Sequence, residues 1–207
     1  MALLFANNSS LSSITALPSG ISGGGLNLIK EQTASSSASI SFVNGVDGVV
    51  LDGTYKEYIF KFINIHPATD ASVFEFNLST DSGSNYNVIK TTTFFYAQHY
   101  ENDASTEFGY DTGQDLAQST SYQRLGLSIG SDNDQSGSGY LHLFNPSSNT
   151  YVKHFMASFG TVRSDDLQTD VHTAGYANTV SAINSIDFKF HNASNIDDGI
   201  IKLYGVS

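Results

Sequence analysis

Hydrophobic and polar residues alternate along most of the chain after about residue 25. In the segment SVFEFNLS, Phe74, Phe76 and Leu78 fall on one side of an extended backbone, opposite Glu75 and Asn77. The segment SIDFKFHN repeats this pattern further along. A period of two predicts β-strands with one buried and one solvated face.

The same period predicts eleven strands separated by turn residues. The predicted strands are residues 26–33, 38–43, 57–65, 72–79, 87–100, 122–130, 138–145, 151–163, 172–180, 185–192 and 199–206. One segment, QDLAQS (114–119), suggests a helical turn, and no segment sustains a period of 3.6. Short strands without crossover helices predict an all-β fold, an antiparallel jelly-roll-like β-sandwich.

The segment YIFKFINIHP leaves two choices for its buried face. The alternatives are Tyr58, Phe60 and Phe62, or Ile59, Ile63 and Ile65. His66 follows the last alternating residue and directly precedes Pro67, which removes a backbone donor and favours extended geometry before it. We therefore expect His66 to be a structural residue at a strand end. The other five histidines form no close pair along the chain, which argues against a histidine metal site.

Residues 1–25 differ from the rest of the chain, because they contain no charged side chain before Lys30 and end in a run of glycines. The string GISGG matches the nucleophile elbow of hydrolases, but it lacks the preceding strand and following helix, so we interpret it as a hinge. We predict an extended N-terminal arm, residues 1–25, that anchors a β-sandwich domain, residues 26–207, to another protein. The anchoring residues are expected to be Leu3, Leu4, Phe5, Leu11, Ile14 and Leu17.

Composition narrows the function classes. The 207 residues are enough for one core, and 14 Phe and 11 Tyr supply it. The absence of cysteine excludes disulfides and thiolate metal sites. A net charge of −11 disfavours nucleic acid as a partner. The first residues have neither the basic start nor the apolar length of a signal peptide or membrane helix, so we expect no membrane partner.

Two patterns of acidic residues suggest sites. Asp132, Asp134 and Ser136, followed by Gly137, resemble the first half of a calcium loop, but Leu143 stands where the closing glutamate belongs. A solvated hairpin tip explains the same residues, so calcium is a weak candidate and no metal or cofactor is expected. Three acidic pairs suggest glycoside hydrolysis, but adjacent strand residues point to opposite faces. The pairs are Asp165 with Asp166, Asp197 with Asp198, and Glu101 with Asp103. We assign no catalytic residue.

Several stretches together resemble small virion structural proteins of tailed bacteriophages that infect marine bacteria. They are the arm LSSITALPSGISGG, the strands LIKEQT and SASISF, the block EYIFKFINIHPATD, the stretch KTTTFFY, the segment LFNPSSNTYVKHF and the ending DDGIIKLYGV. The resemblance covers nearly the whole chain. It implies a non-enzymatic β-sandwich protein on the virion surface, assembled in the host cytoplasm, and it brings no site residues with it.

Two roles are compatible with this resemblance. In the first, the arm docks on other virion proteins, such as a major capsid, neck or tail protein, and the sandwich decorates or cements the head, with a trimer as the expected homo-oligomer. In the second, the protein is a tail fibre or receptor-binding protein whose loops recognise a host surface glycan or protein. The Tyr-rich segment 98–115 favours recognition. Its candidate contact residues are Tyr100, Glu101, Asn102, Phe108 and Tyr110.

Overall fold

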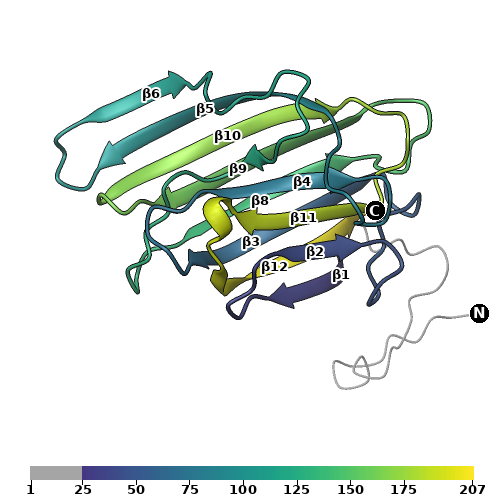
Figure 1. Cartoon of the computed structure of the whole chain (residues 1–207), viewed down its shortest axis with the longest axis horizontal. Helices are drawn as coiled ribbons and strands as arrows, with labels where there is room; N and C mark the ends of the chain where they lie inside the picture. The colour runs from purple at the N-terminus through teal and green to yellow at the C-terminus, as the bar shows by residue number, and fades with distance from the viewer. Residues whose placement is uncertain (1–24) are drawn as a thin grey trace, which may run out of the picture.

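Two antiparallel β-sheets pack face to face in the computed structural model, which describes residues 25–207 (Figure 1). The large sheet contains, in spatial order, β1 (Leu26–Thr33), β12 (Ile196–Val206), β3 (Glu57–Pro67), β8 (Gly137–Phe144), β9 (Lys153–Val162), β10 (Leu167–Ala177), β5 (Lys90–Tyr100) and β6 (Thr106–Tyr110). The small sheet contains β2 (Ile40–Val43), β11 (Ser185–Phe190), β4 (Phe74–Ser79) and β7 (Gln123–Arg124). A short 3-10 turn, η2 (His191–Ala193), follows β11.

The chain crosses between the sheets repeatedly, because β2 and β4 lie in the small sheet while β3 and β5 lie in the large one. Strands far apart in sequence thereby become neighbours, as β2 and β11 do. This interleaving is the jelly-roll arrangement, in which β1, β12, β3 and β8 form one four-stranded half and β2, β11, β4 and β7 form the other, while β9, β10, β5 and β6 extend the large sheet beyond β8. The prediction of an all-β antiparallel sandwich is confirmed.

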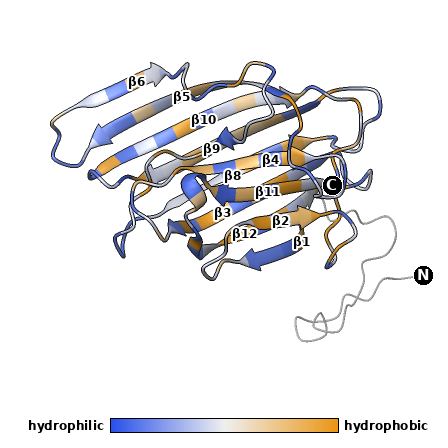
Figure 2. Cartoon of the chain, in the orientation of Figure 1, coloured by the Kyte–Doolittle hydropathy of each residue, from blue (hydrophilic) through white to orange (hydrophobic). Residues whose placement is uncertain are grey.

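The hydrophobic core lies where the small sheet covers the large one, and Figure 2 shows hydrophobic residues gathered there. Phe188 is at its centre, with ring centroids 5.3 Å from Phe60 and 5.1 Å from Phe62. All three side chains are at most 2% exposed. Large aromatic side chains bury the most apolar area per residue, so this cluster supplies much of the driving force for folding.

A β-bulge in β3 decides between the two alternatives for its buried face. Tyr58, Phe60 and Phe62 face the core, and the register then shifts between Phe62 and Ile65. Asn64 has a positive φ of 50° at this point. The extra residue returns Ile65 to the core, where it is 0% exposed. The strand continues to Pro67, so His66 is the next-to-last residue of β3 and does not lie beyond the end of the strand.

The predicted strand 122–130 is wrong over most of its length, since only Gln123–Arg124 pairs as β7. Leu125 and Ile129 are buried as the alternation suggested. Ser128 between them has a positive φ of 48°, which interrupts the extended backbone. Ile129 instead forms isolated bridges to Ser72 and Arg163.

The predicted helical turn at 114–119 is also wrong. Its backbone groups bind the edge of β5 instead: the amide of Lys90 donates to the carbonyl of Ser119 at 2.8 Å, and that of Thr92 to the carbonyl of Leu116 at 2.9 Å. A backbone engaged with a neighbouring strand cannot close a helical turn on itself. The segment 113–122 therefore lies across the open side of the small sheet.

This covering segment, residues 113–122, overturns the expectation of a solvated face on β4. Glu75 is 4% exposed and Asn77 is 0% exposed, so both faces of β4 are buried. The polar side chains remain satisfied because Asn77 Nδ2 donates to the carbonyl of Thr120 at 3.0 Å.

The expected arm residues Leu3, Leu4, Phe5, Leu11, Ile14 and Leu17 lie outside the described residues. Their role, and the division of the chain at residue 25, stay predictions. Among residues 25–207, no helix is long and apolar enough to span a bilayer.

Candidate functional site

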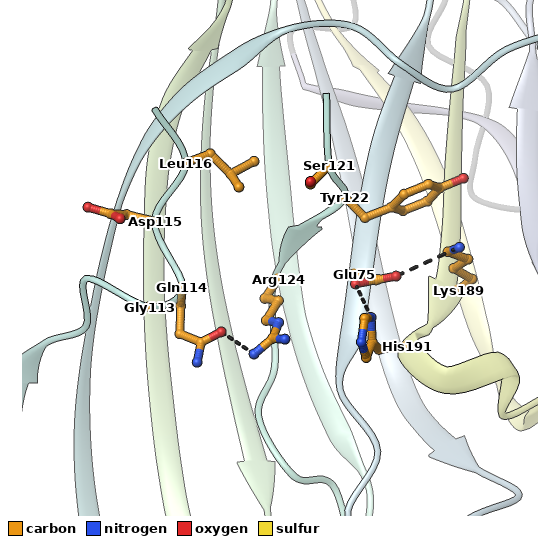
Figure 3. Close-up of a pocket in the computed structure, with 10 residues that line it drawn as sticks. All are labelled: Glu75, Gly113, Gln114, Asp115, Leu116, Ser121, Tyr122, Arg124, Lys189 and His191. Carbon is orange, nitrogen blue, oxygen red and sulfur yellow. Dashed lines mark hydrogen bonds and ion pairs between the residues drawn. The ribbon is translucent and has the colours of Figure 1, made fainter. Parts of the chain in front are cut away.

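A polar pocket opens between the small sheet and the covering segment (Figure 3). Its volume is about 430 Å³. Strands β4, β7 and β11 and the turn η2 each contribute one charged or titratable side chain to it. These are Glu75 from β4, Arg124 from β7, Lys189 from β11 and His191 from η2. The remaining lining comes from the covering segment and comprises Gly113, Gln114, Asp115, Leu116, Ser121 and Tyr122.

Glu75 is the buried centre of this pocket. Its carboxylate lies 3.3 Å from Nδ1 of His191 and 3.8 Å from Nζ of Lys189. Burial raises the pKa of Glu75, and the positive charge of His191 and Lys189 partly opposes that rise. A buried carboxylate held between a lysine and a histidine is typical of a structural polar network rather than of a free general base.

The side chains of Tyr122 and Arg124 complete the wall of the pocket. Tyr122 donates its hydroxyl to Oδ2 of Asp187 at 3.0 Å, and Nζ of Lys189 lies 4.0 Å from the centre of the Tyr122 ring. Burial and the nearby Asp187 carboxylate raise the pKa of Tyr122. Arg124 donates through Nη1 to Oε1 of Gln114. The arrangement of acidic, basic and amide side chains can bind a small polar group.

A second candidate site is the outer face of the large sheet, which the small sheet does not cover. One cross-strand row on this face consists of Leu28, Tyr204, Ile59, His142, Met156, Ala174 and Thr93. The next row consists of Glu31, Lys202, Lys61, Tyr140, Ser158, His172, Phe95 and Tyr110. We call these two rows the outer face.

The two rows of the outer face carry no acidic excess, although the net charge of the chain is −11. In its two rows only Glu31, Lys61 and Lys202 carry a formal charge, and Lys202 pairs with Glu31 at 2.8 Å. Four of its large hydrophobic side chains are markedly exposed. They are Leu28 at 55%, Tyr110 at 52%, Tyr140 at 44% and Met156 at 56%. Tyr140 and Met156 lie on the adjacent strands β8 and β9, whereas Leu28 and Tyr110 lie on the two edge strands, β1 and β6.

A shallow, mostly apolar hollow lies at one end of this face, between β5, β9 and β10. Its volume is about 460 Å³. Its rim includes His154, Met156 and Tyr176, and the His154 and Tyr176 rings lie 6.2 Å apart. The face therefore offers both protruding side chains, such as Met156, and a recess.

The structure divides the predicted recognition residues into two groups. Tyr100, Glu101 and Asn102 line a pocket of about 410 Å³ together with Asp165 and Asp166. The segment 98–115 is not one loop, because it contains β6, and there the side chains of Phe108 and Tyr110 are 75% and 52% exposed. Phe95, the cross-strand partner of Tyr110, contacts Phe108 with ring centroids 6.0 Å apart.

The calcium candidate residues lie in a turn before β8. The amide of Gln135 donates to the carbonyl of Asp132 at 2.9 Å, which closes the turn. Asp134 and Ser136 line a pocket that Asp132 does not line. Within residues 25–207, no three His, Asp or Glu side chains are grouped to hold a metal ion. Calcium binding at this turn stays a prediction.

His66 contacts a backbone carbonyl group of a distant turn, which is a structural contact. Its Nδ1 lies 2.8 Å from the carbonyl oxygen of Gln135, which ties β3 to the turn before β8.

Sequence reasoning missed the pocket around Glu75. The alternation placed Glu75 and Lys189 correctly on the side opposite the phenylalanines, but it gave no sign that the covering segment would close over them. The available signal was the mixture of Leu116 with polar residues in QDLAQSTSY, a composition suited to lying on a polar sheet face.

No family model, curated protein or solved structure matches the chain. The function is therefore argued from the sequence and from the geometry of these sites.

Proposed function

We propose that this chain is a non-enzymatic structural protein of a tailed-phage virion, which displays its β-sandwich on the particle as a decoration or cement subunit. The observation that carries the proposal is the outer face. Its two rows run across the large sheet with three formal charges, while the rest of the chain holds the acidic excess. A sheet face that lacks the acidic excess of the rest of the protein is suited to contact with a neighbouring subunit.

The occupant that this face fits best is a second copy of the same chain. Acidic copies repel one another at most orientations, and the outer face is where two copies approach with the least like-charge repulsion. The protruding Met156 and the recess beside Tyr176 give the face a shape that can interlock with itself. The arm, residues 1–25, is proposed to attach the resulting oligomer to other virion proteins.

Locating the chain in purified particles tests this function. Labelling with an antibody against the β-sandwich should mark the head at many positions. Labelling confined to the tail end would favour the second role below, and particles without the chain would overturn a virion role altogether.

The second candidate is a tail-fibre or receptor-binding role, supported by one specific observation. The β5–β6 hairpin extends past the small sheet (Figure 1) and carries Tyr100, Glu101 and Asn102 in a pocket at its end. Tyrosine and acidic or amide side chains at an exposed tip suit contact with a sugar or protein on the host surface.

A further inference from the structure

Lys90 is a buried lysine at the start of β5 with an unusual partner. Its side chain is 0% exposed. Its Nζ donates to Oδ1 of Asn77 at 2.5 Å and to the carbonyl of Val88 at 2.8 Å. Within the described part of the chain, no carboxylate forms an ion pair with this amine. Burial alone lowers the pKa of Lys90 to about 7, so much of the amine is neutral, and thus nucleophilic, at neutral pH.

Asn77, on β4, is held rigidly against this amine. Its Nδ2 donates to the carbonyl of Tyr86 at 2.6 Å and to that of Thr120 at 3.0 Å. Its Oδ1 also accepts the backbone N–H of Leu78 at 2.9 Å. Because Cγ is bonded to Oδ1, it lies within about 3.7 Å of Nζ of Lys90. The amide carbon is thus close to attack distance, and the Leu78 N–H can stabilise negative charge on Oδ1.

We propose that Lys90 and Asn77 react with each other to form an intramolecular isopeptide bond. The neutral Nζ attacks Cγ of Asn77, and the carbonyl electrons move to Oδ1. The Cγ–Nδ2 bond then breaks. One proton passes from Nζ to Nδ2, which leaves as ammonia. The product is a secondary amide between the two side chains, and the step needs no oxidant, metal or cofactor.

The bond would join the two sheets covalently, since Asn77 belongs to the small sheet and Lys90 to the large one. The chain has no cysteine, so this amide would take the place that a disulfide holds in other exposed proteins. Burial of both side chains excludes the water that would otherwise hydrolyse the amide.

Lys153 provides an internal comparison. It is also 0% exposed, but its Nζ donates to the backbone carbonyl of Thr179 at 3.1 Å. Because no hydrogen bond joins Nζ to a side-chain amide among the described residues, Lys153 has no group from which ammonia could be expelled.

Mass spectrometry of the intact, purified protein tests the proposal directly. The wild-type chain should be lighter than its sequence mass by one ammonia molecule, and protease digestion should yield a branched peptide that joins residues 77 and 90. Lys90→Met and Asn77→Ala should have their full sequence masses, whereas Lys153→Met should keep the loss of ammonia. A wild-type chain of full mass that yields separate, unmodified peptides would overturn the bond.

Discussion

Phe74 and Phe188 stack on one another across β4 and β11, with ring centroids 6.1 Å apart and planes inclined by 16°. The two strands place these rings side by side because Phe188 pairs with Phe76 and Phe190 with Phe74, so that all lie on the core face. This contact fixes the phase of both strands and thereby determines which polar side chains fall on the opposite face, under the covering segment.

Phe188→Ala should lower the free energy of unfolding by about 3–5 kcal/mol, because it removes a ring from the centre of the core and leaves a cavity. Urea unfolding followed by fluorescence or circular dichroism measures the loss. Phe108→Ala is the matched control, since that ring is 75% exposed and its removal should change stability by less than about 0.5 kcal/mol. Equal losses at both positions would mean that β11 presents its other face to the core.

Gly139→Ala should destabilise the protein by about 1–3 kcal/mol through overpacking. A Cβ at Gly139 would lie 2.2 Å from the carbonyl oxygen of Ser158 and 2.8 Å from Cα of Phe159, and neither backbone atom can move freely within the β8–β9 pair. At Gly53 the nearest atom to such a Cβ is Oγ of Ser147 at 3.6 Å, so Gly53→Ala is the control. A stability difference near zero between the two variants would contradict the close approach of β8 and β9.

Glu75→Gln should change how stability depends on pH. Burial raises the folded-state pKa of Glu75, so its contribution to stability is fully present below the pKa of the unfolded chain, about 4.3, and is lost as pH rises through the folded value. Glutamine does not titrate. The free energy of unfolding of Glu75→Gln minus that of the wild type should therefore increase between pH 4 and pH 7. A difference that falls over this range would mean that His191 and Lys189 outweigh the burial of the carboxylate.

Deleting residues 1–25 should leave a cooperatively folding β-sandwich, since β1 begins at Leu26 and its pairing with β12 is intact without them. Differential scanning calorimetry should show one transition close to that of the full chain. The shortened protein is expected not to attach to particles. Loss of the transition, or normal attachment, would contradict the anchoring role of the arm.

The sequence predicted most strands because their side chains alternate between a core and a polar environment. The prediction of strands failed where both faces of a strand carry polar side chains or where the backbone bends. The N-terminal half of β10 was missed because its buried positions include Thr169, and the bulge at Asn64 cannot be read from side-chain type alone. β6 was interpreted as loop because the side chains of Thr106, Glu107, Phe108 and Tyr110 are all exposed and do not alternate between a core and a polar environment.

The sites depend on tertiary contacts that no local pattern contains. The sequence identified Asn77 as polar-facing and placed Lys90 inside the predicted strand 87–100. Their 2.5 Å contact arises because the chain between them turns from the small sheet to the large one while the covering segment closes over both. Likewise, the two rows of the outer face follow from the strand order, which pairs β8 with β3 and β12 with β1.

The most direct test of a virion subunit that associates through its outer face is competition for incorporation into particles. Tyr140→Asp with Met156→Asp introduces charge into both rows of the face, whereas Tyr151→Asp changes a side chain that is 70% exposed outside these strands. Each variant would be expressed during infection, and its copies per purified particle would be counted by quantitative mass spectrometry. We predict normal incorporation of Tyr151→Asp and a loss of at least about tenfold for the double variant, the effect of about 1.4 kcal/mol in binding free energy. Equal incorporation of both variants, or absence of the wild-type chain from particles, would contradict the account.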